Sequence, residues 1–325
     1  MERVFVTGGS GFLGGALIRE LVERGFAARA LARSATARAI VSGLGAEPVP
    51  GDLDDLTAMK AGMAGCKFVF HSAAYAKDHG PRAEFFRANV QGTDNVIASA
   101  RAAGVERLVH VSTEAVLADG RAIVKADEER PIAERPVGLY PLTKGIAERH
   151  VRAAASAGFD AVVVRPRFIW GRGDTTLLPA MVKAVHDGRW RWIDGGHYLT
   201  STCHVANAVE GLLCAAERGV RGGVYFLTDG PPVEFRSFVG ELLLAAGADP
   251  GKKELPLWLA RLIATLTSFL PNPPITRTAL ALVAQEVTVN DARARRELNY
   301  LGKKSIQEGV SELRAQRTDA FTKAQ

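Results

Sequence analysis

The sequence predicts a doubly wound α/β fold, in which helices cover both faces of a parallel β-sheet. Short apolar or β-branched runs alternate with longer stretches of helical periodicity through the first half of the chain, as in successive βαβ units. Four glycines between Gly8 and Gly14 come directly after the first run and before the first helical stretch. They place bare backbone where such sheets bind their ligands.

The alternation assigns each element in turn. The expected strands are RVFVTG, AARALAR, AEPVPG, KFVFHSAA, RLVHVST and AVVVRP, and the expected helices between them cover residues 11–24, 53–64, 82–103 and 139–157. After Gly171 the alternation loosens. We expect helices over 176–186 and 205–217, a strand at GVYFLT, and a mostly helical chain from Pro231 with a short strand at VTV.

Composition restricts the class of protein. The net charge of +6 comes from 41 basic and 35 acidic residues that are scattered along 325 residues, so we expect no nucleic-acid partner. The cysteines Cys66, Cys203 and Cys214 form no CxxC pair, which disfavours a disulfide framework and a structural metal site. The first strand begins by Val4, leaving no room for a signal segment before it. We expect a cytoplasmic protein.

The most apolar stretch runs from Leu255 to Pro271 and contains Pro256 and Arg261. It falls short of the roughly 20 apolar residues that a spanning helix needs. We expect a buried or lid helix and no membrane association, with shallow attachment to a bilayer surface as the alternative.

The glycine turn has the features of a dinucleotide site. Gly9, Gly11 and Gly14 satisfy GxGxxG between a strand and a helix. The turn needs a residue free to adopt positive φ, and backbone amides at the helix start bind a pyrophosphate closely only where no side chain intervenes. A glycine turn without a ligand is the alternative. The motif indicates a Rossmann fold, with a dinucleotide-binding domain over residues 1–170, return segments near 190–228, and a substrate-binding part over 171–325.

The second strand bears on which dinucleotide binds. No acidic residue occurs between Glu23 and Glu47, whereas an NAD site usually has one about 20 residues beyond the glycines. Arg33 at the end of this strand is suited to a 2′-phosphate, unless it is a solvated surface charge. We therefore expect NADP(H), with NAD(H) as the alternative.

Asp52, after the third strand, either reaches the adenine or caps the next helix.

Tyr140 and Lys144 are four residues apart at the start of an expected helix, so both lie on one face. An ammonium group and a positive nicotinamide both favour the phenolate, so the pKa of Tyr140 is expected to fall toward neutrality. The tyrosine would then exchange a proton with a substrate oxygen. Thr113 ends the fifth strand at the same sheet edge and would hydrogen-bond the reacting oxygen, or act as a turn former.

These residues resemble the extended branch of the short-chain dehydrogenases and reductases. TGGSGFLG resembles its glycine motif, Tyr140 with Lys144 its YxxxK, Thr113 its catalytic Ser or Thr, and RPRFIWG its segment beside the nicotinamide. HSAA and NVQGTDNV resemble its fourth strand and central helix. The resemblance covers nearly the whole chain and is strongest to the branch that acts on 3β-hydroxysteroids and lipid-like ketones or alcohols.

The resemblance implies roles for particular residues. Thr113, Tyr140 and Lys144 would be catalytic, with Lys144 also holding the nicotinamide ribose. Together with Arg33 and Asp52, the expected cofactor contacts are Gly8, Gly11, Phe12, Leu13, Gly14, Leu53, Ala73, Tyr140, Lys144, Pro166 and Ile169. Tyr75, Phe168 and Trp170 either wall an apolar pocket or are core aromatics. His204 either contacts substrate or has a packing or capping role, which we favour.

The implied activity is an NADP(H)-dependent oxidoreductase that interconverts a ketone and a secondary alcohol on an apolar, steroid-like or lipid-like small molecule. Dehydration of a sugar nucleotide is disfavoured, because Glu114 is followed by Ala115 instead of completing an Asp-Glu pair. A nucleotide-sugar epimerase of the same family and a non-catalytic NADP(H)-binding redox sensor are the alternatives. The family often forms homodimers through the helix that carries YxxxK and the central helix, which we expect here only on that ground.

Overall fold

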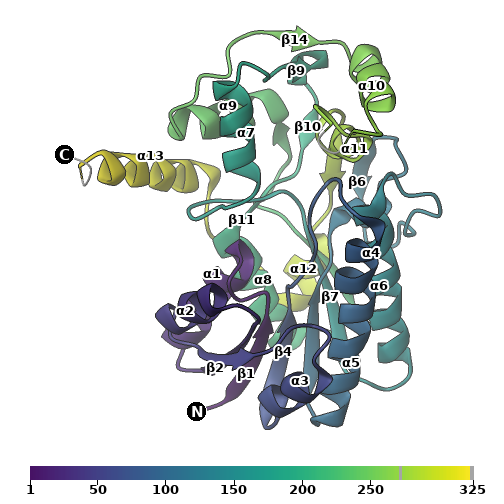
Figure 1. Cartoon of the computed structure of the whole chain (residues 1–325), viewed down its shortest axis with the longest axis vertical. Coiled ribbons are helices and arrows are strands. Elements are labelled where there is room, and N and C mark those ends of the chain that lie inside the picture. Colours follow the sequence, from purple (N-terminus) through teal and green to yellow (C-terminus); the bar gives the residue numbers. More distant parts are fainter. Residues whose placement is uncertain (271–272, 323–325) are drawn as a thin grey trace.

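The central sheet of the computed structural model, which describes residues 1–270 and 273–322, has seven parallel strands in the order β12-β7-β5-β4-β1-β2-β3 (Figure 1). Their bounds are β1 Arg3–Thr7, β2 Ala27–Ala32, β3 Glu47–Pro50, β4 Cys66–His71, β5 Arg107–Val111, β7 Ala161–Pro166 and β12 Val224–Leu227. The strand order reverses between β1 and β4, so the carboxyl ends of these two strands form the switch point where such sheets bind ligands. The predicted doubly wound fold is confirmed.

Helices cover both faces because alternate strand residues are apolar on both sides. Val4 and Val6 pack on one face, and Phe5 between them packs on the other. The helices on the Val4 face are α1 Phe12–Glu23, α8 Val205–Arg218 and α12 Ala292–Leu298, and those on the Phe5 face are α3 Leu56–Met63, α5 Gly92–Ala102 and α6 Leu139–Ser156.

Two helical segments differ from the sequence expectation. Helix α2, Ala35–Gly43, was not expected, and it begins where Ser34 Oγ accepts a hydrogen bond from Ala37 N at 3.0 Å. The helix expected over 82–103 is divided into α4 (Arg82–Phe85), a π-helical turn η1 (Phe86–Gln91) and α5.

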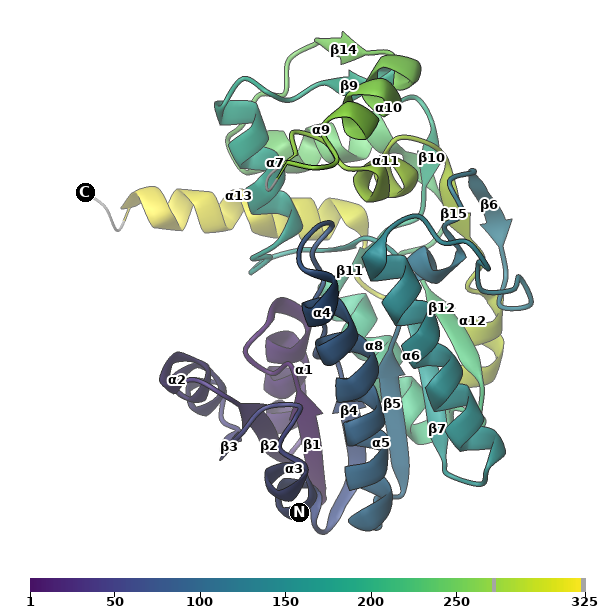
Figure 2. The same ribbon diagram turned by 45° about the vertical axis from the view of Figure 1, so that its right-hand side comes forward.

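The remaining elements lie beyond the carboxyl ends of the central strands (Figure 2). A four-stranded sheet in the order β13-β10-β15-β6 holds this part together within the described chain. The strands here are β6 Ile123–Ala126, β8 Ile169–Trp170, β9 Trp192–Ile193, β10 Leu199–Thr200, β11 Cys203–His204, β13 Val233–Glu234, β14 Glu254–Leu255 and β15 Val287–Val289. The helices are η2 Glu114–Leu117, α7 Leu177–His186, η3 Asp194–Gly196, α9 Phe235–Ala245, α10 Leu257–Leu266, α11 Arg277–Val283 and α13 Ile306–Thr322.

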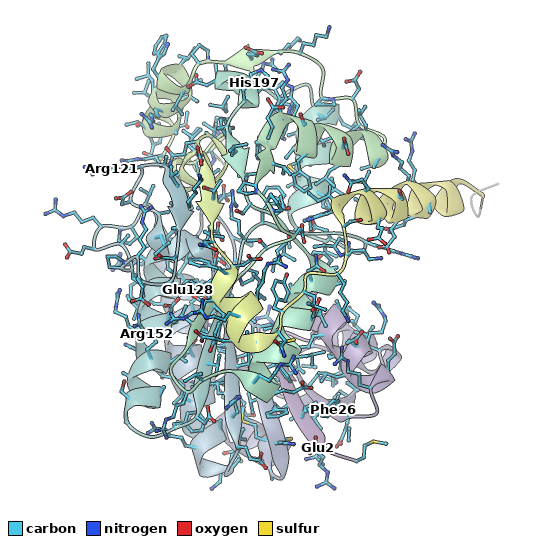
Figure 3. The ribbon with its side chains drawn as sticks, turned by 180° about the vertical axis from the view of Figure 1, so that it is seen from behind. Glu2, Phe26, Arg121, Glu128, Arg152 and His197 are labelled. Atoms are coloured by element: carbon cyan, nitrogen blue, oxygen red, sulfur yellow. The ribbon has the colours of Figure 1, made fainter. Side chains whose placement is uncertain are left out.

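The chain crosses between the two parts more often than the expected boundary near residue 170 implies. Strand β6 from the first half pairs with β15, where Ile123 is the register partner of Val287. In the reverse direction, α12 returns to the central sheet. Glu128 lies beside α12 in the view from behind (Figure 3), and its Oε1 accepts a hydrogen bond from Phe226 N of the edge strand β12 at 2.9 Å. The domain division therefore stays a prediction.

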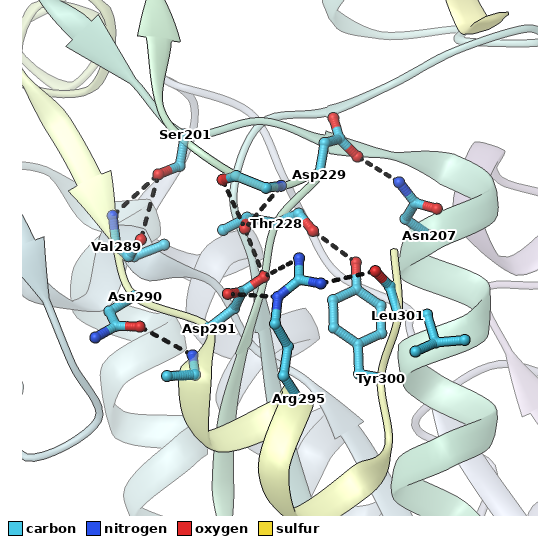
Figure 4. Close-up of polar contacts among 12 residues, drawn as sticks. Ser201, Asn207, Thr228, Asp229, Val289, Asn290, Asp291, Arg295, Tyr300 and Leu301 are labelled. Carbon is cyan, nitrogen blue, oxygen red and sulfur yellow. Dashed lines mark hydrogen bonds and ion pairs between the residues drawn. The ribbon is translucent and has the colours of Figure 1, made fainter. Parts of the chain in front are cut away.

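Polar contacts fasten the end of β12 to its surroundings (Figure 4). The Asp229 carboxylate accepts hydrogen bonds from Asn207 Nδ2 at 2.7 Å, from Trp170 Nε1 at 2.8 Å and from His204 N at 2.5 Å. Nearby, Tyr300 donates to Thr228 O at 2.7 Å. One carboxylate thus fixes β8, β11 and α8 relative to the central sheet.

Among the described helices, none has both the length and the apolar character that crossing a bilayer would require. In the apolar stretch, Leu255 ends β14 and α10 covers Leu257–Leu266, while Pro271 and Asn272 of the following PNPP lie outside the described residues.

Candidate active site

The glycine turn lies at the switch point, between the ends of β1 and β4. Gly8 has φ +74°, and a Cβ there would lie 2.7 Å from Ala73 N. A Cβ on Gly14 would lie 2.2 Å from Gly8 O, so the first turn of α1 packs directly on the loop. Gly11 caps α1 with no side-chain hydrogen bond to its free amides. The turn therefore has the bare backbone and the open helix start that a pyrophosphate requires.

The expected adenosine contacts lie along the same edge. Arg33 follows β2, is exposed, and has no hydrogen-bond or ion-pair partner among the described residues. Arg29, in contrast, donates to Glu47 Oε2 at 2.9 Å and is a structural residue. Asp52 Oδ1 accepts from Asp54 N at 2.9 Å.

The next helix, α3, is capped by Asp55 and not by Asp52, since Asp55 Oδ1 accepts from Ala58 N at 2.9 Å. The capping role considered for Asp52 is therefore wrong. Leu53 O accepts from Asn95 Nδ2 at 2.8 Å, which fixes this loop to α5.

The remaining predicted cofactor residues surround the same edge. Phe12 and Leu13 open α1, Ala73 follows β4, Pro166 ends β7, and Ile169 in β8 pairs with Cys203. The contacts of these residues with a cofactor stay predictions.

Thr113 and Tyr140 come together at the carboxyl edge of the sheet. Thr113 follows β5 and caps the short helix η2, and its Oγ1 accepts from Ala115 N at 3.2 Å. Tyr140 is the second residue of α6, is half-buried, and its phenol interacts with the Thr113 side chain. The two hydroxyls therefore lie near each other at this edge.

The electrostatics around Tyr140 differ from expectation. Burial raises the pKa of the phenol, the Glu114 carboxylate raises it further, and only the Thr113 side chain lowers it. The sequence predicted that Lys144 lowers the pKa of Tyr140, and this effect is not found. The ammonium of Lys144 donates instead to Val111 O at 2.6 Å and lies 3.4 Å from His110 Nε2. In this arrangement Tyr140 retains its proton.

Glu114 is held in a buried chain of contacts. The Thr113 hydroxyl donates to Glu114 Oε2 at 2.9 Å, and Glu114 Oε1 lies 3.2 Å from Arg167 Nη1. Arg167 also donates to Leu282 O at 2.7 Å. Both charged side chains are 4% exposed, so this carboxylate stays fixed beside the two hydroxyls.

Lys144 itself is 3% exposed, and burial lowers its pKa to about 8, with Glu148 acting in the opposite direction. Two buried histidines lie behind it, with ring centroids 5.2 Å apart. Burial and the Lys144 charge lower the pKa of both His71 and His110. His110 Nδ1 has no hydrogen-bond partner among the described residues.

The hydrogen bonds of His71 are those of a neutral ring with its proton on Nε2. Thr93 Oγ1 donates to Asn89 O at 2.7 Å, so it accepts from His71 Nε2 at 3.0 Å. His71 Nδ1 then accepts from Thr7 Oγ1 at 2.7 Å. No role for His71 or His110 was predicted from the sequence, because a histidine within an apolar strand shows no partner until the strands are paired.

One turn beyond Lys144, Glu148 forms an ion pair with Arg165 that is fully enclosed. Arg165 Nε donates to Glu148 Oε2 at 2.9 Å, and Ser112 Oγ donates to the same oxygen at 2.7 Å. The arginine side chain is 1% exposed and the glutamate 0%. This pair fixes α6, and with it Tyr140, against β5 and β7.

The predicted substrate residues have different surroundings. Tyr75 is half-buried near the edge, and its N donates to Asn89 Oδ1 at 2.7 Å. Phe168 and Trp170 are 6% and 1% exposed and pack on Phe238. They are therefore core aromatics, which is one of the two roles considered from the sequence. A substrate contact for Phe168 is therefore not supported by its burial.

His204 caps α8, with Nδ1 accepting from Ala206 N at 3.2 Å, and burial lowers its pKa. It borders a cavity of about 1010 Å³ between α1, α8 and α13 that is lined by charged side chains of both signs. This cavity lies away from Thr113 and Tyr140. The capping role favoured from the sequence describes the observed contact.

Comparison with known proteins agrees with this geometry. Residues 5–257 match the sequence profile described as the 3-beta hydroxysteroid dehydrogenase/isomerase family. The 4-hydroxy-2-methyl-3-oxo-4-farnesyl-3,4-dihydroquinoline-1-oxide ketoreductase of Stigmatella aurantiaca is 51% identical over 319 residues, which cover 96% of each chain. The 2-alkyl-3-oxoalkanoate reductase of Stenotrophomonas maltophilia is 36% identical, over 96% of this chain and 98% of the relative. The crystal structure of gox2253 superimposes with a TM-score of 0.79 at 26% identity, covering 97% of this chain and 99% of that one.

Proposed function

The chain belongs to the 3-beta hydroxysteroid dehydrogenase/isomerase family, and from this membership we propose that it is an NADPH-dependent ketoreductase acting on an apolar ketone. The observation that carries the proposal is the convergence of Thr113 and Tyr140 at the sheet edge, beside the glycine turn and in front of Lys144. Proton donor, orienting hydroxyl and buried cation are the groups that ketone reduction needs.

The residues present fit a nicotinamide dinucleotide. The turn packs so closely that a Cβ at Gly8 or Gly14 would collide with backbone atoms, and α1 begins at Gly11 with no side-chain cap on its amides. Gly8, Gly11 and Gly14 would hold the pyrophosphate, and Lys144 the nicotinamide ribose. When bound, the reduced dinucleotide supplies the hydride.

The proton comes from Tyr140. A carbonyl oxygen that gains negative charge becomes alkoxide-like and more basic than a phenolate, so it takes the proton of the phenol, which burial together with Glu114 keeps protonated at neutral pH. Thr113 would orient the same oxygen, in competition with Glu114 for the hydroxyl hydrogen. A group that retains its proton can serve as the acid that ketone reduction needs.

The preference for NADPH is supported by Arg33. Its guanidinium is exposed at the end of β2 with no partner among the described residues, and the stretch between Glu23 and Glu47 lacks the carboxylate that would bind a ribose 2′-hydroxyl. A 2′-phosphate would pair with it through charge-assisted hydrogen bonds.

The substrate class is supported by the relatives. One is named for a farnesylated dihydroquinoline oxide and the other for 2-alkyl-3-oxoalkanoates, and both carry a keto group beside long apolar chains. We propose that this chain reduces a ketone of the same apolar character, prenylated, alkylated or steroid-like.

Cytoplasmic residence and homodimer formation remain predictions. Free thiols at all three cysteines suit a reducing compartment. On α5 and α6, where the resemblance places the dimer contact, no large apolar side chain is exposed among the described residues. Such a dimer would rest on polar contacts, and light scattering of the purified protein measures it.

The test is NADPH oxidation, followed by absorbance, with a panel of prenylated bicyclic, 2-alkyl-3-oxoalkanoate and steroid ketones. We expect turnover with at least one class and product carrying a new secondary hydroxyl by mass spectrometry. Epimerisation of nucleotide sugars consumes no net NADPH, so it is followed separately by chromatography of the sugar product, and this activity alone would assign the epimerase alternative. Dinucleotide binding without turnover of any class would assign the sensor.

A further inference from the structure

His110 lies inside the central sheet, directly behind Lys144. It belongs to β5, between its register partners His71 of β4 and Val163 of β7, and its side chain is 0% exposed. Its Nε2 lies 3.4 Å from the Lys144 ammonium, and its Nδ1 has no hydrogen-bond partner among the described residues. A polar ring thus occupies a core position where an apolar side chain would avoid the cost of an unpaired nitrogen.

The contact with Lys144 determines which nitrogen of His110 carries the proton. The pKa of Lys144 is lowered only to about 8, so the side chain is an ammonium group at neutral pH and only donates hydrogen bonds. His110 Nε2 therefore presents its lone pair to Lys144, and the ring proton is on Nδ1. Burial and the Lys144 charge lower the pKa of His110, which keeps the ring in this neutral form.

The two acceptors on β5 fix the orientation of the Lys144 ammonium. An ammonium group has three N–H donors. Those of Lys144 donate to Val111 O at 2.6 Å and to His110 Nε2 at 3.4 Å, and the third has no hydrogen-bond partner among the described residues. With Val111 O alone, the group would be free to turn about its C–N bond. With His110 as the second acceptor, the third N–H keeps one direction.

The other ionisable groups around Lys144 already have partners. Glu148, one turn further along α6, raises the pKa of Lys144, but both of its oxygens accept hydrogen bonds from Arg165 of β7. His71 of β4 has both ring nitrogens hydrogen-bonded, and burial lowers its pKa to about 3. Among the described residues, His110 therefore supplies the one side-chain acceptor that contacts the Lys144 ammonium.

We propose that His110 is a positioning residue, which orients the Lys144 ammonium and retains its charge for the ribose of the bound dinucleotide. His110 acts through Lys144 and touches neither cofactor nor substrate. The inference rests on the dinucleotide site of the proposed function and not on the identity of the ketone. Because an acceptor stabilises the charged form of the lysine, loss of His110 should lower the pKa of Lys144.

The test is fluorescence titration of the full chain with NADPH and with NADH between about pH 6.5 and pH 9.5. We expect the affinity of the wild type to fall as the pH rises through the pKa of Lys144, about 8, because the ammonium that binds the ribose is lost. In His110→Leu the fall should begin at lower pH, and NADPH should bind about tenfold more weakly at about pH 8. His110→Gln, whose side-chain oxygen can accept, should restore part of this loss.

A double-mutant cycle separates positioning from a structural role. Lys144→Met should bind NADPH weakly at every pH, without the transition. His110→Leu should have no further effect in the Lys144→Met background, because the group on which it acts is absent.

The matched control is His204→Leu, which replaces a histidine that is 2% exposed and caps α8. It should lower the melting temperature without moving the pH dependence of NADPH binding. Circular dichroism shows whether each variant is folded. His110→Phe keeps a flat ring without nitrogens and takes the place of His110→Leu if that variant does not fold.

An identical pH dependence in His110→Leu and wild type overturns the proposal, as does an equal loss of affinity with and without Lys144. Failure of the wild type to bind either coenzyme overturns both this proposal and the proposed function. Coenzyme binding with the expected pH dependence, but without reduction of any ketone, supports the role of His110 and refutes the proposed function.

Discussion

The Thr113 hydroxyl donates its hydrogen bond to Glu114 Oε2, 2.9 Å away, and so a neighbouring carboxylate competes with any substrate oxygen for that donor. The same carboxylate raises the pKa of Tyr140. Glu114 therefore acts on both hydroxyls of the proposed active site without needing to touch substrate.

Glu114→Gln removes this charge and keeps the shape. Without the negative charge the phenolate is less disfavoured, so the pKa of Tyr140 should fall. Reduction needs the protonated phenol, and the high-pH loss of kcat/KM should begin at lower pH in the variant. Profiles of kcat/KM against pH measure this. A profile that is unchanged, or that moves to higher pH, would contradict the role.

Tyr140→Phe should lower kcat for ketone reduction by about a thousandfold, the scale of a lost general acid. NADPH affinity, measured by fluorescence titration, should stay within about threefold, because the glycine turn is unaltered. A variant that keeps most of its kcat would exclude Tyr140 as the acid.

Arg33→Ala should raise KM for NADPH by about tenfold to a hundredfold, the scale of a charge-assisted hydrogen bond, and leave KM for NADH unchanged. Arg121→Ala serves as control, since Arg121 is also exposed but lies far from the glycine turn near β6 (Figure 3). Equal effects of Arg33→Ala on both coenzymes would show that Arg33 does not select between them.

Glu148→Gln should cost about 3 kcal/mol or more of unfolding free energy, because it leaves Arg165 charged and without a counter-ion in the interior. The surface pair of Glu84 with Arg87 offers the comparison, and Glu84→Gln should cost less than about 1 kcal/mol. Urea denaturation of both variants measures the difference. Equal losses of unfolding free energy would mean that burial does not increase the contribution of the Glu148–Arg165 pair to stability.

The buried histidines should make the fold sensitive to acid. The pKa of His71 is lowered from 6.5 to about 3, so between these values the unfolded chain binds a proton that the folded chain does not. The free energy of unfolding should therefore fall as pH drops from 6.5 toward 3. His71→Gln should flatten this slope, whereas His79→Gln, at an exposed site, should not. Denaturation curves across that range provide the check, and equal slopes in all three proteins would argue against this assignment.

Local sequence pattern predicted most of the fold, because strand alternation, the glycine turn and the start of the Tyr140 helix at Leu139 each depend on neighbouring residues. Helix α2 was missed because Val41 is its one buried residue, so its apolar periodicity is weak. Strand β6 was missed because its partner β15 lies more than 150 residues further along the chain.

At the candidate site, the positions of Thr113 and Tyr140 on the fold were predictable and the electrostatics were not. The YxxxK spacing brought Tyr140 and Lys144 to one side of α6, but the direction of the Lys144 ammonium depends on Val111 O, which strand pairing sets. The charge beside Tyr140 comes from Glu114, whose ion pair with Arg167 joins segments about 50 residues apart in sequence. Long-range contacts of this kind leave no periodic signal.

The pairing of β6 with β15 also bears on how the protein is made. Residues 123–126 have to wait for residues 287–289 to leave the ribosome before their sheet can form, and β12 gains its cover from α12 only after that. Because the pairing of β6 with β15 and the packing of α12 on β12 form late, we expect one cooperative folding event near the end of translation. Sequential folding of two independent halves is less favoured. A fragment that stops after residue 228 would complete the central sheet yet leave its edge uncovered, and we expect it to be captured by chaperones.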